Sequence, residues 1–191
     1  MELNLPAEEL PPLSTVSTDY TPEQQEIIEE YHHVQPVWKF ALLSFFTFGL
    51  YELYWFYKNW SFIKEFEERD EIMPFWRGLF ILFFGQSLFR NVLKRAHQQG
   101  YSQSYSSGWL LAAFIFLTFL SRLPDPLWLI SLFSFIPLIP VLQARNYFFS
   151  KTNPEGKVSS AFTGGEIVTM VIGLVVFVLM IIGLSIGDQP Y

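Results

Sequence analysis

The chain has 191 residues, of which 51% are hydrophobic, 19% are aromatic and only 16% are charged. Soluble domains carry about 25% charged residues, so the composition argues against an ordinary soluble domain and predicts a multi-pass membrane protein. The net charge is −6 and there is no cysteine, which excludes disulfides, thiolate nucleophiles and cysteine metal ligands. No basic stretch of the kind that binds nucleic acid is present, so we expect no nucleic-acid partner.

The N-terminal region, residues 1–36, is predicted to be an acidic tail that ends in a short amphipathic helix. It contains no Lys or Arg, and its first 20 residues are rich in Pro, Ser and Thr. Thr21, Pro22 and Gln24 match a capping box with proline in the first turn, and Pro36 should end the helix. This helix either lies against the membrane or the bundle, or is simply solvated, because its hydrophobic face is narrow.

The first hydrophobic block, Val37–Tyr57, is predicted to be a membrane span. Its 21 residues reach roughly 31 Å as a helix, which is enough to cross the hydrocarbon core. We expect the helix to continue into water and to stop before Pro74. Lys39, near its start, can extend toward the headgroups.

The second block, residues 75–97, is too short for a clear span. Its uncharged core runs from Gly78 to Phe89, about 18 Å of helix, a length typical of re-entrant or interfacial segments. Polar side chains then recur at intervals of three or four, as in an amphipathic helix. Two arrangements stay open: the block spans, or it enters the membrane and returns.

Three further hydrophobic blocks complete the predicted membrane domain, residues 37–187, before a short tail, residues 188–191. Trp109–Leu120 and residues 127–144 should form a helical hairpin around the LPDP turn. Pro137 and Pro140 predict a kink near residues 133–140. Ile167–Ile186 is an uncharged 20-residue span that follows a second capping box.

The distribution of Lys and Arg favours one topology. If all five blocks span, the basic residues divide seven against five; if block two returns, they divide ten against two. Because positive charge gathers on the cytoplasmic side, the sharper asymmetry favours four spans plus one short interfacial or re-entrant helix, with both termini outside, over five spans. The fold class predicted is therefore an all-α, multi-pass membrane helical bundle.

Glu52 lies inside the first block and is the first candidate for a functional residue. An ionisable group in a span is costly and suggests function by default. It lies five residues from the end of the block, however, so we interpret it as structural, near the headgroups or paired with Arg77 or Arg90. With Gln86, these residues form a candidate intramembrane polar cluster. A proton relay would need further acidic partners, and no other span contains Asp or Glu.

Five aromatic residues crowd the end of the first block. We interpret them as an interfacial aromatic belt, which is common in membrane proteins, rather than as a cation-binding cage. They are Tyr51, Tyr54, Trp55, Tyr57 and Trp60.

Arg90, Lys94 and Arg95 are predicted to contact anionic lipid headgroups, although ordinary positive-inside charge explains them equally well. His32 and His33 are adjacent, and adjacent side chains project about 100° apart on a helix, so they cannot easily share one ion. We therefore expect no metal and no cofactor. The chain also lacks the motifs of metalloproteases, hydrolases, P-loops and dinucleotide sites, which predicts a non-enzymatic protein.

The segment LLSFFTFGLYELYWFYKNW resembles the signature of an uncharacterised bacterial integral-membrane family, domain of unknown function 4234. PFWRGLF, LPDPLW and IPLIPVLQARNYF also resemble longer members of this family. The resemblance implies a bacterial multi-pass protein of the inner (plasma) membrane, and it carries no activity, ligand or catalytic residue. The matching motif positions are Thr47, Gly49, Leu50, Tyr51, Tyr54, Trp55 and Tyr57.

The leading functional hypothesis is a non-enzymatic membrane component that scaffolds or regulates a partner complex or senses the lipid bilayer. Its partner would be another membrane protein or a second copy of the chain. The alternative is a small transporter or channel-like protein, with Glu52, Gln86 and Arg90 lining a polar path. A membrane enzyme acting on lipid ranks third, because it would need clustered acid, base or metal residues.

Overall fold

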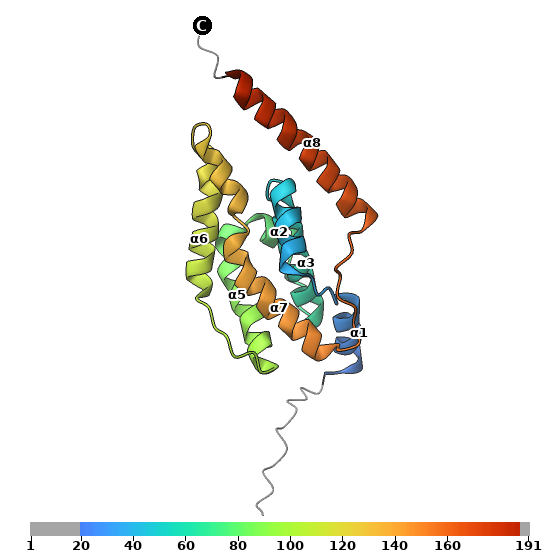
Figure 1. Ribbon diagram of the computed structural model, residues 1–191. Helices are drawn as coiled ribbons and strands as arrows, with labels where there is room; N and C mark the ends of the chain where they lie inside the picture. The colour runs from blue at the N-terminus through green and yellow to red at the C-terminus, as the bar shows by residue number, and fades with distance from the viewer. Residues whose placement is uncertain (1–19, 188–191) are drawn as a thin grey trace, which may run out of the picture.

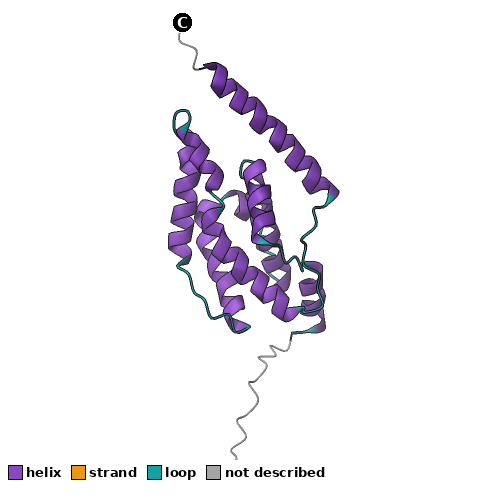
Figure 2. Ribbon diagram, in the orientation of Figure 1, coloured by secondary structure: helices purple, strands orange, loops and turns teal. Residues whose placement is uncertain are grey.

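The computed structural model describes residues 20–187, with side chains to residue 183, and the regular elements of this part of the chain are all helices joined by loops (Figures 1 and 2). The predicted all-α class is confirmed. The α-helices are α1 (Pro22–Glu30), α2 (Val37–Phe46), α3 (Leu50–Phe66), α4 (Pro74–Leu79), α5 (Ile81–Gln98), α6 (Ser107–Phe119), α7 (Ile139–Thr152) and α8 (Gly164–Gly187). Three short 3₁₀ helices, η1 (Leu120–Arg122), η2 (Leu127–Phe133) and η3 (Ile136–Leu138), connect α6 to α7.

The first hydrophobic block is a helical hairpin and not a single span. Helix α2 ends at Phe46, the chain turns, and α3 runs back beside it (Figure 1). The ring of Phe40 in α2 contacts that of Trp55 in α3, with centroids 5.7 Å apart. The prediction of one continuous helix over 37–57 is therefore wrong. Each arm is shorter than a span, since α2 has 10 residues and about 15 Å of length.

The turn of this hairpin is built by Thr47, Phe48 and Gly49. The hydroxyl of Thr47 donates to the carbonyl of Leu43 at 2.7 Å, which ends α2, and accepts from the amide of Tyr51 at 3.0 Å, which starts α3. Phe48 and Gly49 have φ of 54° and 84°, in the left-handed region that glycine tolerates best. Hydropathy does not register this break, because the residues on both sides are equally apolar.

The second block also forms a hairpin. Helix α4 packs antiparallel on α3, where Gly78 lets the backbone of Tyr57 approach closely. The chain breaks at Phe80, and α5 returns to the end from which α4 started, where Arg95 bonds Glu67 at 2.6 Å. The second block therefore doubles back on itself as a helical hairpin, which is the shape expected of the alternative in which the block returns.

The third hairpin consists of α6 and η1 on one arm and η2, η3 and α7 on the other (Figure 1). The cap of α6 is Ser106, which accepts from the amide of Trp109 at 3.4 Å. Two prolines, Pro137 and Pro140, lie where the second arm is 3₁₀ up to Leu138 and α-helical afterwards. The predicted interruption near residues 133–140 is confirmed, because proline removes a backbone donor there.

The turns of the three hairpins lie toward one end of the fold, which we call the tip end: residues 47–49, residue 80 and residues 120–126 (Figure 1). The opposite, base end collects the connections 31–36, 67–73, 99–106 and 153–163. The hydroxyl of Tyr31 donates to Glu65 at 2.6 Å at this end. The N-terminal segment therefore lies on the same side as the connection after α3, and the predicted placement of the two on opposite sides is wrong.

Helix α8 runs beside α2 and then projects past its tip (Figure 1). Lys39 pairs with Glu166 near the start of both helices, and Gly173 lies against the carbonyl of Phe46 at the end of α2. On each helix, seven residues separate the contact between Lys39 and Glu166 from the contact between Phe46 and Gly173, which is about 10 Å of helix. Phe45 of α2 also contacts Phe177 of α8, with ring centroids 5.6 Å apart, so the first hairpin covers about the first half of α8.

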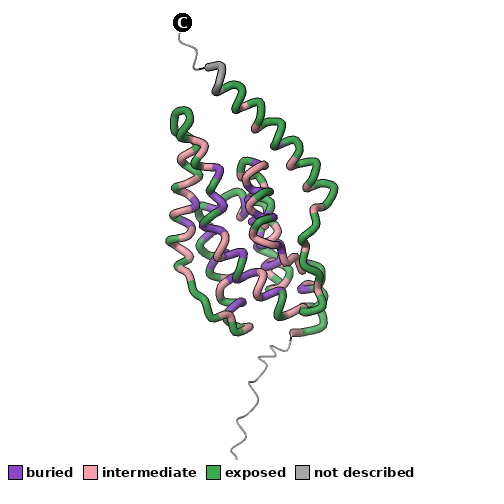
Figure 3. The backbone as a smooth tube through the Cα atoms, in the orientation of Figure 1, coloured by how far each residue is buried: buried purple, intermediate pink, exposed green. Residues whose placement is uncertain are grey.

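The buried residues lie mainly where the helices face one another, and much of the outer surface is exposed (Figure 3). The core is largely apolar but also holds charged groups, and large apolar side chains lie on the surface. Lys39 is fully buried and Arg145 is 6% exposed, whereas Phe83 and Trp109 are each 74% exposed. Charged residues are almost never buried in soluble proteins, and large exposed apolar surfaces mark membrane or protein contacts. This distribution fits a membrane environment.

Two segments of the described chain are long and apolar enough to cross a membrane, Leu127–Thr152 and Gly164–Gly183. Val37–Phe46 and Ser107–Arg122 are apolar but shorter. By length and composition, fewer segments of the described chain could cross a membrane than the predicted four. The main reason is that the turn divides the first block into two shorter helices.

Candidate functional site

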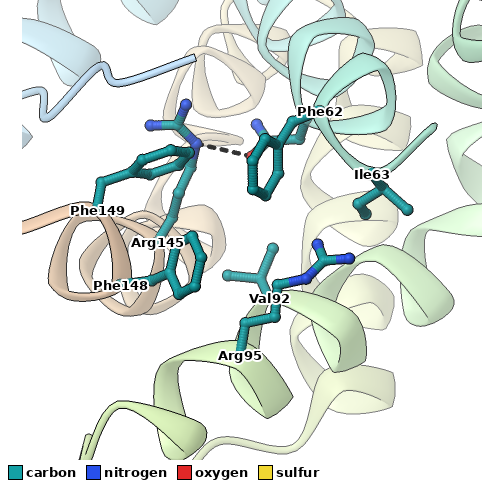
Figure 4. Close-up of a pocket in the computed structure, with 8 residues that line it drawn as sticks. Phe62, Ile63, Val92, Arg95, Arg145, Phe148 and Phe149 are labelled. Carbon is teal, nitrogen blue, oxygen red and sulfur yellow. Dashed lines mark hydrogen bonds between the residues drawn. The ribbon is translucent and has the colours of Figure 1, made fainter. Parts of the chain in front are cut away.

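Arg145 of α7 joins the base of the first hairpin to the N-terminal segment. Its Nε donates to Oδ1 of Asn59 at 2.8 Å (Figure 4). Its two terminal nitrogens donate to the carbonyls of His33 at 2.6 Å and Tyr31 at 3.5 Å. The guanidinium also lies 4.5 Å from the ring centroid of Phe149. All of these partners are neutral, and no described carboxylate forms an ion pair with Arg145.

A second arginine, Arg95 of α5, lies at the same meeting point of α3, α5 and α7 (Figure 4). It stacks on Phe62 and Phe66 at 5.2 and 5.1 Å and pairs with Glu67 at 2.6 Å. Unlike Arg145, it has a carboxylate partner. Between the two arginines the core leaves a cavity of only about 10 Å³.

The Lys39–Glu166 pair links α2 to α8. Lys39 Nζ lies 2.9 Å from Glu166 Oε2 and also donates to the carbonyl of Ala161 at 2.8 Å. The same carboxylate accepts from the amide of Thr163 at 2.7 Å, and the Thr163 hydroxyl accepts from the amide of Glu166 at 3.3 Å. The second predicted capping box is confirmed, and its carboxylate is already neutralised by Lys39.

Between the first hairpin, the start of α8 and the N-terminal segment lies a chamber of about 600 Å³. Toward the base end it is lined by polar groups, among them Lys58, Asn59 and Arg145. Toward the tip end it is lined by Leu43 and Leu50. The chamber is therefore amphipathic along the axis of the hairpin.

The charge in the chamber affects His33, which lies in the connection before α2. Burial and the neighbouring guanidinium of Arg145 lower the pKa of His33 to about 4. Lys39 also lowers this pKa, while Glu166 opposes the shift. The imidazole is therefore neutral near pH 7, and the cations that line the chamber are Lys58 and Arg145.

The predicted polar cluster is not assembled. Glu52 is buried near the turn of the first hairpin, where Ser134 donates to its two oxygens at 3.0 and 3.3 Å. Arg77 lies instead over the rings of Trp60 and Phe84, at 4.8 and 5.2 Å. Arg90 and Gln86 face outward on α5. Among the described contacts, Glu52 pairs with neither Arg77 nor Arg90, so the expected pairing is wrong. The described residues therefore do not form the polar path of the transport hypothesis.

The predicted aromatic belt faces outward only in part. Tyr54 and Tyr57 are exposed, but Trp55 and Trp60 are buried in the core, and Tyr51 is half-buried. The turn at Thr47–Gly49 starts α3 at Leu50 and fixes which face of the new helix meets the core. A single helix over the whole block does not predict which of these aromatic residues face the core.

The predicted headgroup contacts also divide. Arg90 and Lys94 are exposed on one face of α5, where helical spacing places them together. Arg95 points into the core and does not join them. Among the described residues no group of three His, Cys, Asp or Glu could hold a metal ion, so His32 and His33 have no further ligands of that kind.

Sequence reasoning missed Arg145 as the central residue and missed its acceptor Asn59. Asn59 and Arg145 each follow shortly after the end of a predicted block, at residues 57 and 144. A polar side chain at such a position is expected to lie in water. The structure continues α7 to Thr152, and the neighbouring Asn146 likewise bonds the backbone of Gln35.

Comparison of the chain with models of protein families, with curated proteins and with solved structures gives no match. The function must therefore be argued from the residues and the fold.

Proposed function

We propose that the chain is a non-enzymatic integral membrane protein that scaffolds or regulates a membrane partner. The observation that carries this proposal is the projecting half of α8. In this half Phe177 still packs on Phe45 of α2, with ring centroids 5.6 Å apart, but most of the other apolar side chains are exposed: Leu174, Val175, Val176, Val178, Leu179 and Ile182. An apolar helix face that the chain's own fold leaves exposed suits packing against a transmembrane helix of another chain.

We further propose that the three hairpins enter the membrane from one side. The first two hairpins are half-inserted, whereas Ser107–Arg122, Leu127–Thr152 and α8 cross. Of the 12 Lys and Arg residues, Arg122 alone lies in a hairpin turn, and the others lie on the arms or in the connections at the base end. Because cytoplasmic segments carry the excess of Lys and Arg, the base end is cytoplasmic.

A photo-crosslinking residue at Leu179 tests the partner proposal in native membranes. Leu179 is 63% exposed, and Phe116 on α6 is a matched control at 64%. We expect a discrete protein adduct from Leu179 and lipid adducts alone from Phe116. The mass of the adduct separates a different protein from a second copy of the chain. Lipid adducts alone at both positions would overturn the partner proposal.

The transport alternative is tested separately, because it requires activity of the isolated chain. Protein reconstituted in liposomes should move no ion or solute under our proposal. Flux that disappears in Glu52→Gln would overturn the scaffolding proposal and restore the transport hypothesis.

A further inference from the structure

The chamber beside α8 holds two cations that the fold does not neutralise. Arg145 has five N–H donors, and three of them are used by neutral acceptors, which leaves two. Lys58 lies 4.6 Å from the ring centroid of Tyr31 and forms none of the described ion pairs. A buried guanidinium without a counter-charge is costly, so an anion in the chamber would be strongly favoured.

The carboxylates that line the chamber do not supply that counter-charge. Glu166 is already paired with Lys39 at 2.9 Å. Glu30 is exposed at the rim, at the end of α1. Neither carboxylate is within 4 Å of Arg145 or Lys58 in the described ion pairs.

A third donor in the chamber wall also lacks an acceptor. Trp55 lines the chamber and is 4% exposed, and its indole N–H has no hydrogen-bond partner. A buried polar group without a partner costs about 1–3 kcal/mol, which is why nearly all such groups are satisfied. Three buried or half-buried donors without matching acceptors thus border the same space.

The side of the chamber nearest the tip end has the opposite character. Leu50 and Tyr54 stand at its edge and are 68% and 55% exposed. Helix α8 touches the rest of the fold chiefly through α2. An acyl chain can therefore leave the chamber between α3 and α8 over apolar side chains, whereas a small free anion would gain nothing from that surface.

We propose that this chamber binds one anionic phospholipid, with the headgroup phosphate on Arg145 and Lys58 and the acyl chains leaving between α3 and α8. Guanidinium and ammonium groups are the usual phosphate ligands, and the planar guanidinium binds two oxygens at once. The inference rests on the membrane placement proposed above. It does not depend on the partner of α8.

The test uses the full chain, purified in detergent and stripped of lipid, in native mass spectrometry with three additives. We expect one molecule of phosphatidylglycerol to bind, and phosphatidylcholine and inorganic phosphate to bind at least tenfold more weakly. Equal binding of inorganic phosphate would overturn the lipid assignment in favour of a free-anion site. Equal binding of phosphatidylcholine, or no binding of any lipid, would overturn the headgroup site.

Two variants locate the bound lipid. Lys58→Gln removes one charge-assisted contact and should weaken phosphatidylglycerol about tenfold. Lys94→Gln makes the same charge change on the exposed face of α5 and should leave the affinity unchanged. Equal losses in both variants would show general charge attraction and would contradict the site. Arg145→Lys should also weaken binding, and Lys58→Gln keeps the test valid if that variant does not fold.

The membrane placement is tested independently, on membranes from the cells that supply the purified protein. If alkaline carbonate releases the native chain from membranes, the placement itself fails, whatever the lipid result. If the chain stays in the pellet and phosphatidylglycerol does not bind, only the chamber inference fails.

Discussion

Lys39 and Glu166 form an ion pair, with Nζ 2.9 Å from Oε2, that joins the start of α2 to the start of α8. The side chain of Lys39 is fully buried, and that of Glu166 is 16% exposed. The pair sets the level at which α8 begins relative to the first hairpin. It also leaves Arg145 and Lys58 as the cations without a carboxylate in the neighbouring chamber.

Removing one member of this pair should be costly, and removing both should cost less. Glu166→Gln leaves a buried ammonium with neutral acceptors only, so we expect the unfolding free energy to fall by about 2–4 kcal/mol. The double variant Lys39→Met/Glu166→Gln should recover at least half of that loss, because no buried charge then lacks a partner. Thermal unfolding in one detergent measures Glu166→Gln, Lys39→Met and the double variant against the native chain. Additive losses in the double variant would mean that the two side chains do not interact.

The close approach of α8 to α2 at Gly173 should tolerate no side chain. A Cβ at this position would collide with the backbone carbonyl of Phe46, so one helix must move. We expect Gly173→Ala to lower the unfolding free energy by about 1–3 kcal/mol. Gly183→Ala, on the same helix with nothing within 4 Å, is the control. Equal stability of the two variants would show that α8 does not pack on α2.

The turn of the first hairpin should depend on Thr47. Thr47→Val removes both the bond that ends α2 and the bond that starts α3, which should cost about 1–2 kcal/mol. Thr118→Val removes one hydrogen bond within α6 and serves as the control. If Thr118→Val costs as much as Thr47→Val in the same unfolding assay, the role of Thr47 in the turn is refuted.

Stability should decrease in mild acid through His33. Its folded pKa is about 4, below the ordinary value of 6.5, so between these values the unfolded chain binds a proton that the folded chain does not. The unfolding free energy is therefore highest above pH 6.5, falls as the pH decreases toward 4, and changes little through this group below that.

The variant His33→Asn should flatten this part of the pH profile, by on the order of 1–2 kcal/mol between pH 6.5 and 4 for a half-buried group. The ring of His97 is exposed at the end of α5, and His97→Gln should keep the native profile. A native slope in His33→Asn would assign the acid sensitivity to other groups.

The parts of this fold that could be predicted from sequence are those with local chemical causes. The capping boxes at Thr21 and Thr163 form as their side chains require, and Pro137 and Pro140 interrupt the second arm of the third hairpin. The short core of block two predicted its return, because twelve residues of helix are too short to span.

The turn at residues 47–49 could not be predicted from hydropathy, since apolar residues flank it on both sides. The relevant clue was Gly49, which is only a motif position by sequence and which adopts a left-handed backbone conformation. The prediction of one span over residues 37–57 also placed the N-terminal segment and the connection after α3 on opposite sides. It also concealed that Trp55 and Trp60 face the core.

Arg145 shows a different limit. Its partners, Asn59 and the carbonyls of Tyr31 and His33, come from segments far apart in the chain. Their meeting depends on three helices packing at one end of the bundle, which no local pattern encodes. A charge near the predicted end of a span therefore looked solvated, although the fold buries it.

The most direct test of the proposed arrangement is the sidedness of three exposed positions in a chain that has no native cysteine. Gln25→Cys, Ser102→Cys and Ser121→Cys are treated with a membrane-impermeant maleimide in intact cells. If all hairpins enter from the cytoplasm, Ser121→Cys is labelled at once, whereas Gln25→Cys and Ser102→Cys react only after the membrane is opened. Labelling of Gln25→Cys with protection of Ser102→Cys in intact cells would mean that the first block crosses the membrane. Labelling of both with protection of Ser121→Cys would mean that the base end is outside, and either result would contradict the arrangement.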